Sequence, residues 1–234
     1  MRVLINLKCI LSFVVLVPSI LSAQKIEKEF SSVSFNVEQL QELKREFGTY
    51  KIIPLVYETQ ILIALSYFPE LKNTYIEFRL KKKETPLSSR TRLSGLLQSA
   101  NKRKYLVTIS QETKQYLTPI LFKNLHFNGQ IGVLGHELSH IADYTNKGFG
   151  KMGQIIVIEV FSKKKVDTFE YNTDLACINH GLGYQLLDWS SSVRNSLGRE
   201  NWRGANNVKA NTKNERYMNP KTIMQIMSNL TIYK

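Results

Sequence analysis

The chain has no apolar run long enough to be an unambiguous membrane span, which takes about 20 residues. Its longest apolar stretch, Cys9 to Ile20, follows a start with two basic residues and precedes small residues. This order is typical of an export signal. We therefore expect residues 1–23 to be a signal peptide that is cut before Gln24. An uncleaved membrane anchor over residues 3–21 is the alternative, because Leu21, the third residue before the expected cut, is not the small residue that cleavage favours there.

Cysteine is almost absent. The two cysteines are Cys9 and Cys177, and Cys9 would leave with the signal peptide. A single remaining thiol excludes an intramolecular disulfide, even in the oxidising compartment that export implies. No cysteine follows the apolar stretch at a lipid-attachment position, which argues against a lipoprotein. Residues 24–234 are enough for one domain with a sizeable core and too few for two.

Acidic residues are scarce, with 19 Asp and Glu against 32 Lys and Arg and a net charge of +13. The excess is concentrated in residues 72–104, with ten basic residues against two acidic ones, and in residues 199–234, with seven against two. Such segments can attract an anionic envelope polymer, a lipid surface or acidic peptides. Nucleic acid is not an expected partner, because an exported chain without a recognition motif is a poor candidate. The alternative is that these side chains only keep the surface solvated.

Hydrophobic periodicity predicts an α+β chain with its strands early and its helices late. Helical spacing predicts helices at 36–47, 58–67, from about 128 onward, 153–163, 167–180, 182–196 and 220–227. Alternation predicts strands at 74–80 and 105–109, and the charged segment 81–90 is expected to be a loop. We see no internal repeat. One domain is expected over residues 24–198, followed by a basic, Asn-rich segment over 199–234 that either wraps the domain or is mobile.

One motif carries chemistry. Residues 135–140 read Gly-His-Glu-Leu-Ser-His, an H-E-x-x-H motif inside a predicted helix. Residues four apart stand one above the other, so His136 and His140 can bind one zinc ion at about 2.0–2.1 Å. Glu137 lies beside them, where it can act as general base toward a zinc-bound water. The opposite side of the helix carries an apolar stripe: Ile131, Leu134, Leu138 and Ile141. A chance pentapeptide on a core helix is the alternative.

A catalytic zinc needs a third protein ligand and an open position. The sequence offers Glu170, thirty residues after His140, and Asp174 one turn further along the same predicted helix. Glu170 would bind the metal, and Asp174 would accept a hydrogen bond from the free N–H of a ligand imidazole. If Glu170 were not the ligand, Asp174 or Glu159 would be next in line. The alternative is a pair of solvated acids on an exposed face.

H-E-x-x-H on one helix with E-x-x-x-D on a later one resembles the gluzincin branch of the zincin metallopeptidases, over roughly residues 105–190. The resemblance implies a minimal single-domain, zincin-like fold, with the residues of both motifs in the roles given above. It also implies a small early sheet whose edge strand lies above the metal and pairs with an extended peptide. Tyr105 to Ile109 matches that strand in order and character. The metzincins are not similar, because they need a third histidine where this chain has Asn146.

Enzymes of this branch often add a Tyr or His that donates a hydrogen bond to the oxyanion of the transition state. Candidates downstream of the second motif are Tyr171, His180 and Tyr184. No spacing rule selects among them, and His180 is placed where it can instead cap a helix end. Cys177 and His126 are expected to have structural roles.

These patterns together predict an exported, zinc-dependent metallopeptidase with one Zn²⁺ per chain and no organic cofactor. It would act on a peptide or protein substrate in the periplasm or outside the cell. A zinc amidase that acts on a cell-wall peptide has the same site, since the same metal-bound water attacks any suitable carbonyl. A non-catalytic envelope-binding protein with a vestigial metal site is the alternative from another class. The intact Glu137 argues against it, because a structural site needs no general base.

Overall fold

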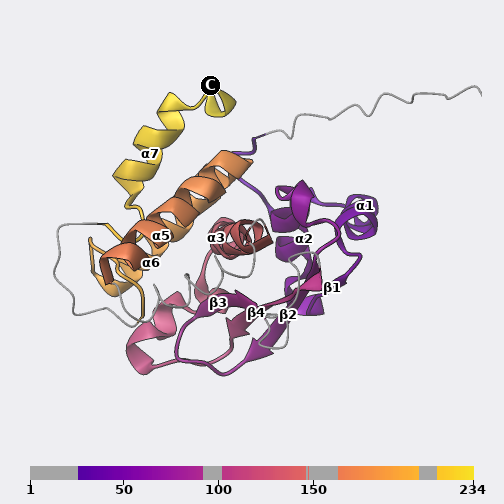
Figure 1. Cartoon of the computed structure of the whole chain (residues 1–234), viewed down its shortest axis with the longest axis horizontal. Helices are drawn as coiled ribbons and strands as arrows, with labels where there is room; N and C mark the ends of the chain where they lie inside the picture. The colour runs from indigo at the N-terminus through magenta and orange to yellow at the C-terminus, as the bar shows by residue number, and fades with distance from the viewer. Residues whose placement is uncertain (1–25, 92–101, 146, 148–162, 206–214) are drawn as a thin grey trace, which may run out of the picture.

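The computed structural model describes residues 26–91, 102–145, 147, 163–205 and 215–234, which form a small mixed sheet beside a larger helical half (Figure 1). The expected signal peptide, Glu159 and nearly all of the helix expected at 153–163 lie outside the described residues. Among the helices described, none combines the length and the apolar character that a membrane crossing requires.

The main helices are α1 (Val37–Phe47), α2 (Glu58–Ser66), α3 (Phe127–Thr145), α5 (Lys163–Cys177), α6 (Gly183–Leu197) and α7 (Pro220–Asn229). Short helical turns lie at Ser32–Ser34, Leu55–Tyr57, Pro69–Leu71, Gln115–Ile120, Phe122–Asn124, Ile178–Leu182 and Thr231–Tyr233. Each helix that was predicted within the described residues is found, within about four residues of its expected bounds.

Within the described residues the sheet has four strands, in the order β1-β2-β4-β3. β1 (Lys51–Ile52), β2 (Tyr75–Lys81) and β4 (Lys104–Ser110) are parallel, and β3 (Leu87–Thr91) pairs antiparallel with β4. The prediction that 105–109 forms the edge strand is therefore wrong, because β4 lies between β2 and β3. Its residues from 105 to 110 are all buried, as in a strand covered on both faces.

β3 forms one edge of the described sheet, and it occupies residues 87–90 of the segment that was predicted as a charged loop over 81–90. Its central residues Ser88, Ser89 and Arg90 show no apolar alternation, so a pattern of hydrophobicity cannot find this strand. The strand forms because β4 offers its backbone groups, and Ser89 pairs with Val107 in the middle of the ladder. An edge strand has only one paired side and tolerates polar residues.

Capping residues begin α1 and α7, as the sequence indicates. The side chain of Asn36 accepts a hydrogen bond from the backbone N–H of Gln39 at 2.8 Å, and the Gln39 side chain accepts one from the backbone of Asn36 at 3.0 Å. This capping box begins α1. Asn219 caps α7, where its side chain accepts from the backbone N–H of Thr222 at 3.0 Å and Pro220 takes the first helical position.

α3 lies at the centre of the molecule and contacts α2, α5, α6 and β3 (Figure 1). The predicted apolar stripe of Ile131, Leu134, Leu138 and Ile141 is completely buried. The opposite side of α3 is buried as well, because α5 and α6 pack over it. α6 approaches most closely at Gly132, where a Cβ atom would lie 2.1 Å from the carbonyl oxygen of Gln185. Glycine is required at this crossing.

α5 and α6 follow one another through a single wide turn. Gly181 in that turn has a φ of 93°, a left-handed conformation that favours glycine. The described part of the C-terminal segment wraps the domain, since Trp202, Met218 and Met227 are buried and α7 packs on α6. The turn and this wrapping bring residues from late in the chain to α3.

Candidate metal centre

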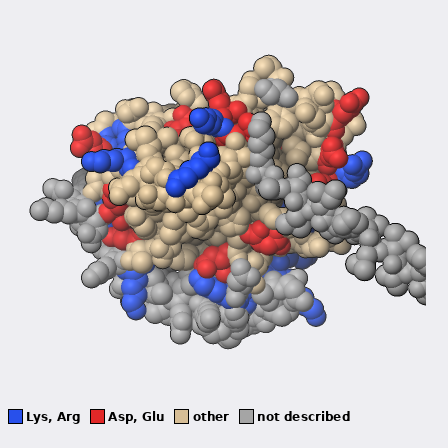
Figure 2. Space-filling view, turned by 90° about the horizontal axis from the view of Figure 1, so that it is seen from above, with Lys and Arg blue, Asp and Glu red and all other residues tan. Residues whose placement is uncertain are grey.

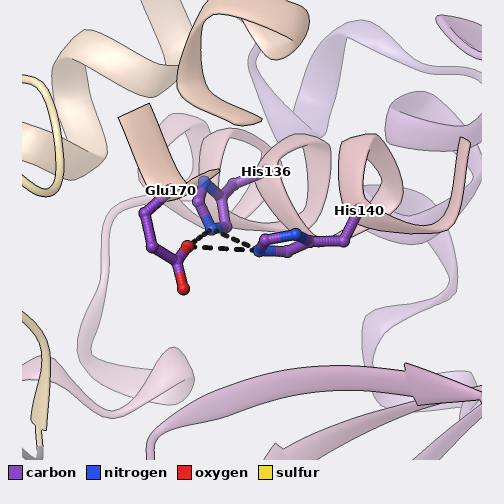
Figure 3. Close-up of side chains that lie close together, drawn as sticks. All are labelled: His136, His140 and Glu170. Carbon is purple, nitrogen blue, oxygen red and sulfur yellow. Dashed lines mark hydrogen bonds and ion pairs between the residues drawn. The ribbon is translucent and has the colours of Figure 1, made fainter. Parts of the chain in front are cut away.

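Three side chains that the motifs single out meet on one side of α3 (Figure 3). Nε2 of His136 lies 3.1 Å from Nε2 of His140. Oε2 of Glu170 lies 3.3 Å from the first of these nitrogens and 3.2 Å from the second. The histidines come from consecutive turns of α3, and the carboxylate comes from α5, which packs against it. The three atoms form a nearly equilateral triangle.

The hydrogen-bond partners of the two imidazoles place their protons away from the triangle. Nδ1 of His136 donates to Oδ1 of Asp174 at 2.8 Å, because a carboxylate can only accept. Nδ1 of His140 lies 3.2 Å from the hydroxyl of Thr173, which donates its own proton to the carbonyl of Phe169 at 3.0 Å. Both Nδ1 atoms therefore act as donors, so that each ring, when neutral, presents its Nε2 lone pair to the triangle.

Asp174 therefore accepts a hydrogen bond from the imidazole of His136, one of the two histidines of the motif. Sequence reasoning did not identify Thr173 as a partner of His140, because a threonine in a helix belongs to no motif that indicates such a contact. The only hint was its position, one residue before Asp174 and three after Glu170. That spacing brings it toward α3 on the same side of α5 as Glu170.

The centre attracts positive charge. Burial disfavours a charged imidazole at His136, but the hydrogen bond with Asp174 and the nearby Glu170 outweigh it and raise the pKa of His136 to about 10. Burial also disfavours the charged form of Glu170, yet His140 and His136 hold the pKa of that carboxyl well below its usual range. The carboxylate is therefore ionised although it is largely buried.

The triangle has the dimensions of a tetrahedral zinc site. Metal–ligand distances of about 2.0–2.1 Å place tetrahedral ligand atoms about 3.3–3.4 Å apart. The observed separations of 3.1, 3.2 and 3.3 Å come within about 0.2 Å of this spacing. Oε2 of Glu170 is a buried acceptor to which no described residue gives a well-formed hydrogen bond. A cation bonded to all three atoms would satisfy it, and two imidazoles with one carboxylate can bind a divalent transition-metal ion such as zinc or iron(II).

A cavity of about 90 Å³ lies beside the triangle, and both His136 and Glu137 line it. Glu137 is buried and is not one of the three side chains that form the triangle. The other walls are mostly apolar and come from distant parts of the chain, among them Phe122, Val133, Trp189, Val193 and Trp202. A ligand in this cavity would touch an imidazole, a carboxylate and an apolar wall at once.

Tyr217 also lines the cavity, and sequence reasoning missed it. Its ring centroid lies 5.5 Å from that of His136 and 5.9 Å from that of Trp189. Burial, followed by the negative charges of Glu170 and Glu137, raises the pKa of Tyr217 well above its usual value. The phenol therefore keeps its proton and can act as a hydrogen-bond donor. Because Tyr217 is distant in sequence from both motifs, no sequence pattern indicated its role.

The segment 216–218 crosses α5 and α6, and two hydrogen bonds fix its backbone there. The guanidinium of Arg194 donates to the carbonyl of Tyr217 at 3.0 Å. The backbone N–H of Met218 donates to Oδ2 of Asp174 at 2.7 Å. Asp174 therefore holds an imidazole with one oxygen and this segment with the other. The C-terminal segment, which was expected either to wrap the domain or to be mobile, contributes Tyr217 to the cavity.

The three residues predicted as possible hydrogen-bond donors to the oxyanion do not line the cavity. His180 donates from Nδ1 to the carbonyl of Ala176 at 2.7 Å and from Nε2 to Glu70 at 2.8 Å, so it caps the end of α5. Tyr184 packs edge-on against Tyr233 at 5.6 Å, and Tyr171 packs as a half-buried residue against the core. As expected, Cys177 is a buried core residue. His126 is exposed and lies outside the triangle, with its Nδ1 3.8 Å from Oδ1 of Asp188.

The arrangement can hold a divalent cation, keep a carboxylate beside it and offer a protonated phenol to a bound ligand. Together these functions depend on residues that come from α3, α5 and the segment 216–218 and meet in one place. Comparison with family models, curated proteins and solved structures finds none that matches this chain.

Proposed function

We propose that this protein is an exported zinc metallopeptidase, with His136, His140 and Glu170 as ligands and Glu137 as general base. The observation that carries the proposal is the triangle of donor atoms, with Glu137 and an apolar cavity at its side. The sheet supports the proposal less specifically. β3 is an edge strand, and it contacts α3, the helix that carries both histidines. A zincin-like fold implies such a strand.

When bound, a zinc ion would supply a Lewis acid that polarises the scissile carbonyl and lowers the pKa of a water molecule. Glu137 would accept the proton of that water and return it to the leaving amine. Asp174 and Thr173 keep the two imidazoles oriented, and Tyr217 would donate a hydrogen bond to the developing oxyanion. The apolar cavity would take a side chain of the substrate and exclude water around the base.

Two alternatives share parts of this site. A zinc amidase that acts on a cell-wall peptide would use the same residues, and an envelope-binding protein would keep the metal without turnover. Metal analysis of the purified mature protein, together with cleavage of a diverse peptide library and of cell-wall fragments, separates them. Zinc with peptide cleavage supports the proposal. Cleavage of cell-wall fragments alone indicates the amidase, and zinc without any cleavage indicates the binding protein.

Replacing Tyr217 by phenylalanine should lower kcat by about 10²- to 10³-fold, the usual cost of losing one oxyanion donor. The ring remains to pack against Trp189, so the fold and the zinc content should not change. Steady-state kinetics on a peptide found in the library measures the effect. Tyr184→Phe removes the same hydroxyl outside the cavity and serves as the control. Equal losses in both variants, or none in Tyr217→Phe, would contradict a role for Tyr217 in the reaction.

The proposed export predicts the N-terminus of the mature protein. N-terminal sequencing of protein recovered from its native host should begin at or near Gln24, because the preceding residues have the pattern of a cleaved signal. Mass spectrometry of the intact protein gives an independent measurement of the same cut. A chain that keeps Met1 and fractionates with membranes would establish the anchor over residues 3–21 instead.

A further inference from the structure

Three charged side chains form a buried cluster between α5 and the C-terminal segment. Asp167 on α5 accepts a hydrogen bond from Nε of Arg216 at 2.8 Å, and its other oxygen accepts one from the guanidinium of Arg203. All three residues are buried. On the face of the molecule seen from above, by contrast, acidic and basic side chains are interspersed at the surface, where water screens them and ion pairs contribute little (Figure 2).

Both arginines belong to stretches of chain that form the cavity wall. Arg203 lies between Trp202 and Gly204, and both of these neighbours line the cavity. Arg216 directly precedes Tyr217, which lines the cavity as well. The two stretches are also joined to each other, because Nη1 of Arg216 donates to the carbonyl of Arg203 at 3.3 Å. One carboxylate of α5 therefore holds two parts of the wall.

The cluster completes the attachment of the segment 216–218 to α5. The other end of this segment is held by Asp174, which accepts a hydrogen bond from the backbone N–H of Met218 at 2.7 Å. Asp167 and Asp174 are seven residues apart, about two helical turns, so they lie on the same side of α5. Tyr217 is thus fixed on both sides at the point where its ring enters the cavity.

The ring of Tyr217 also rests against Gly204. A Cβ atom at Gly204 would lie 3.1 Å from Cε2 of Tyr217 and 3.4 Å from its hydroxyl oxygen, so a larger residue would push the ring or its own backbone aside. Gly204 has a φ of 82°, a left-handed conformation that favours glycine. Arg203, which the cluster holds, precedes Gly204 directly. The cluster therefore fixes both the backbone that carries the ring and the backbone that supports it.

Resting on the proposed function, we propose that Asp167 is a positioning residue, which holds the phenol of Tyr217 where the oxyanion of the reaction develops. A buried ion pair often stabilises a protein no more than apolar residues of similar size would. Two guanidiniums on one carboxylate do, however, restrict the geometry of the chain segments that carry them. A donor stabilises a transition state only when it is held in place beforehand, and a misplacement of about 1 Å can cost about 10²-fold in rate.

A double-mutant cycle tests whether Asp167 acts through Tyr217. Asp167→Asn should lower kcat for a library-derived peptide about 10- to 100-fold, with KM and zinc content nearly unchanged. In the Tyr217→Phe background the same change should cost less than about twofold, because the hydroxyl that it positions is gone. Equal losses in both backgrounds overturn the proposal, since a residue that only stabilises the fold acts independently of that hydroxyl. Asp188→Asn makes the matched change outside the cavity wall and should keep the parent kcat.

Two further variants keep the test decisive if Asp167→Asn does not fold. Arg216→Gln leaves one guanidinium on the carboxylate, as a neutral pair, and Gly204→Ala changes no charge. Both should lower kcat about tenfold and lose most of this effect in the Tyr217→Phe background. Gly198→Ala is the control, since Gly198 has a left-handed φ of 59° and an added Cβ atom would meet nothing within 4 Å. Parent kcat in Arg216→Gln overturns the proposal.

Tryptophan fluorescence tests the positioning without turnover. The chain has two tryptophans, Trp189 and Trp202, and both are buried and line the cavity. Acrylamide should quench them more strongly in Asp167→Asn than in the parent, with an unchanged far-UV circular dichroism spectrum. If the parent cleaves no peptide, the proposed function fails, while the quenching still reports whether Asp167 holds the wall. Equal quenching of the two proteins overturns the inference.

Discussion

Replacing Glu137 by glutamine should lower kcat by about 10²- to 10⁴-fold and leave KM, folding and zinc content nearly unchanged. Glutamine has the same size and hydrogen-bonding reach as glutamate but cannot accept the proton. The side chain lines the cavity beside His136 and lies outside the triangle of metal-facing atoms, so the change should not disturb metal binding. Steady-state kinetics with a library-derived peptide and metal analysis of the same preparation measure both effects.

Glu46→Gln is a matched control, because it makes the same change at an exposed carboxylate that pairs with Lys72. That variant should keep the parent kcat. Two results would contradict the peptidase proposal. One is equal cleavage by Glu137→Gln and the parent, and the other is zinc binding without any cleavage by either protein. The second result would make the envelope-binding alternative the better account.

Replacing His140 by alanine should abolish stoichiometric zinc, since it leaves only two of the three donor atoms. His136→Ala should have the same effect, although it also takes a partner from the buried Asp174 and is the more disruptive change. Glu170→Ala should weaken zinc binding by a large factor. Asp174→Asn removes a partner of His136 without removing a ligand, so we expect a loss of about 10- to 100-fold in affinity. Competition with a chromophoric chelator measures all four.

His126→Ala is the matched control for the histidine variants, because His126 is exposed and lies outside the triangle. It should bind zinc like the parent protein. Full zinc affinity in Glu170→Ala would exclude Glu170 as the third ligand and turn attention to Asp174 or Glu159. Asp174 would then have to give up its hydrogen bonds to His136 and to the backbone of Met218, at 2.8 and 2.7 Å.

Local periodicity was sufficient for much of the centre. A helix repeats every 3.6 residues, so the spacing of His136 and His140 already placed both rings on one side of α3. The same rule placed Ile131 and Leu138 on the side that packs. Glu170 and Asp174 were found in the same way, because four residues make about one turn of α5.

The sheet was less accessible to sequence reasoning. β2 could be predicted because Ile76 and Phe78 alternate with exposed or half-buried residues and are buried. β3 could not, because Ser88 and Ser89 fit a strand only when β4 is present to pair with them. Pairing joins residues that are distant in sequence, and a strand at the edge needs little hydrophobic pattern. For this reason the edge was assigned to β4 in error.

The sequence by itself determined which residues can bind a metal and which helix carries them, because both depend on spacing within one helix. Only the tertiary structure decided what surrounds them. Tyr217 reaches the cavity because Arg194 and Asp174 hold the segment around it across α5 and α6. Thr173 completes the hydrogen bonding of His140 only after α5 has packed on α3. Contacts of this kind depend on how whole helices pack, and no local pattern of residues encodes them.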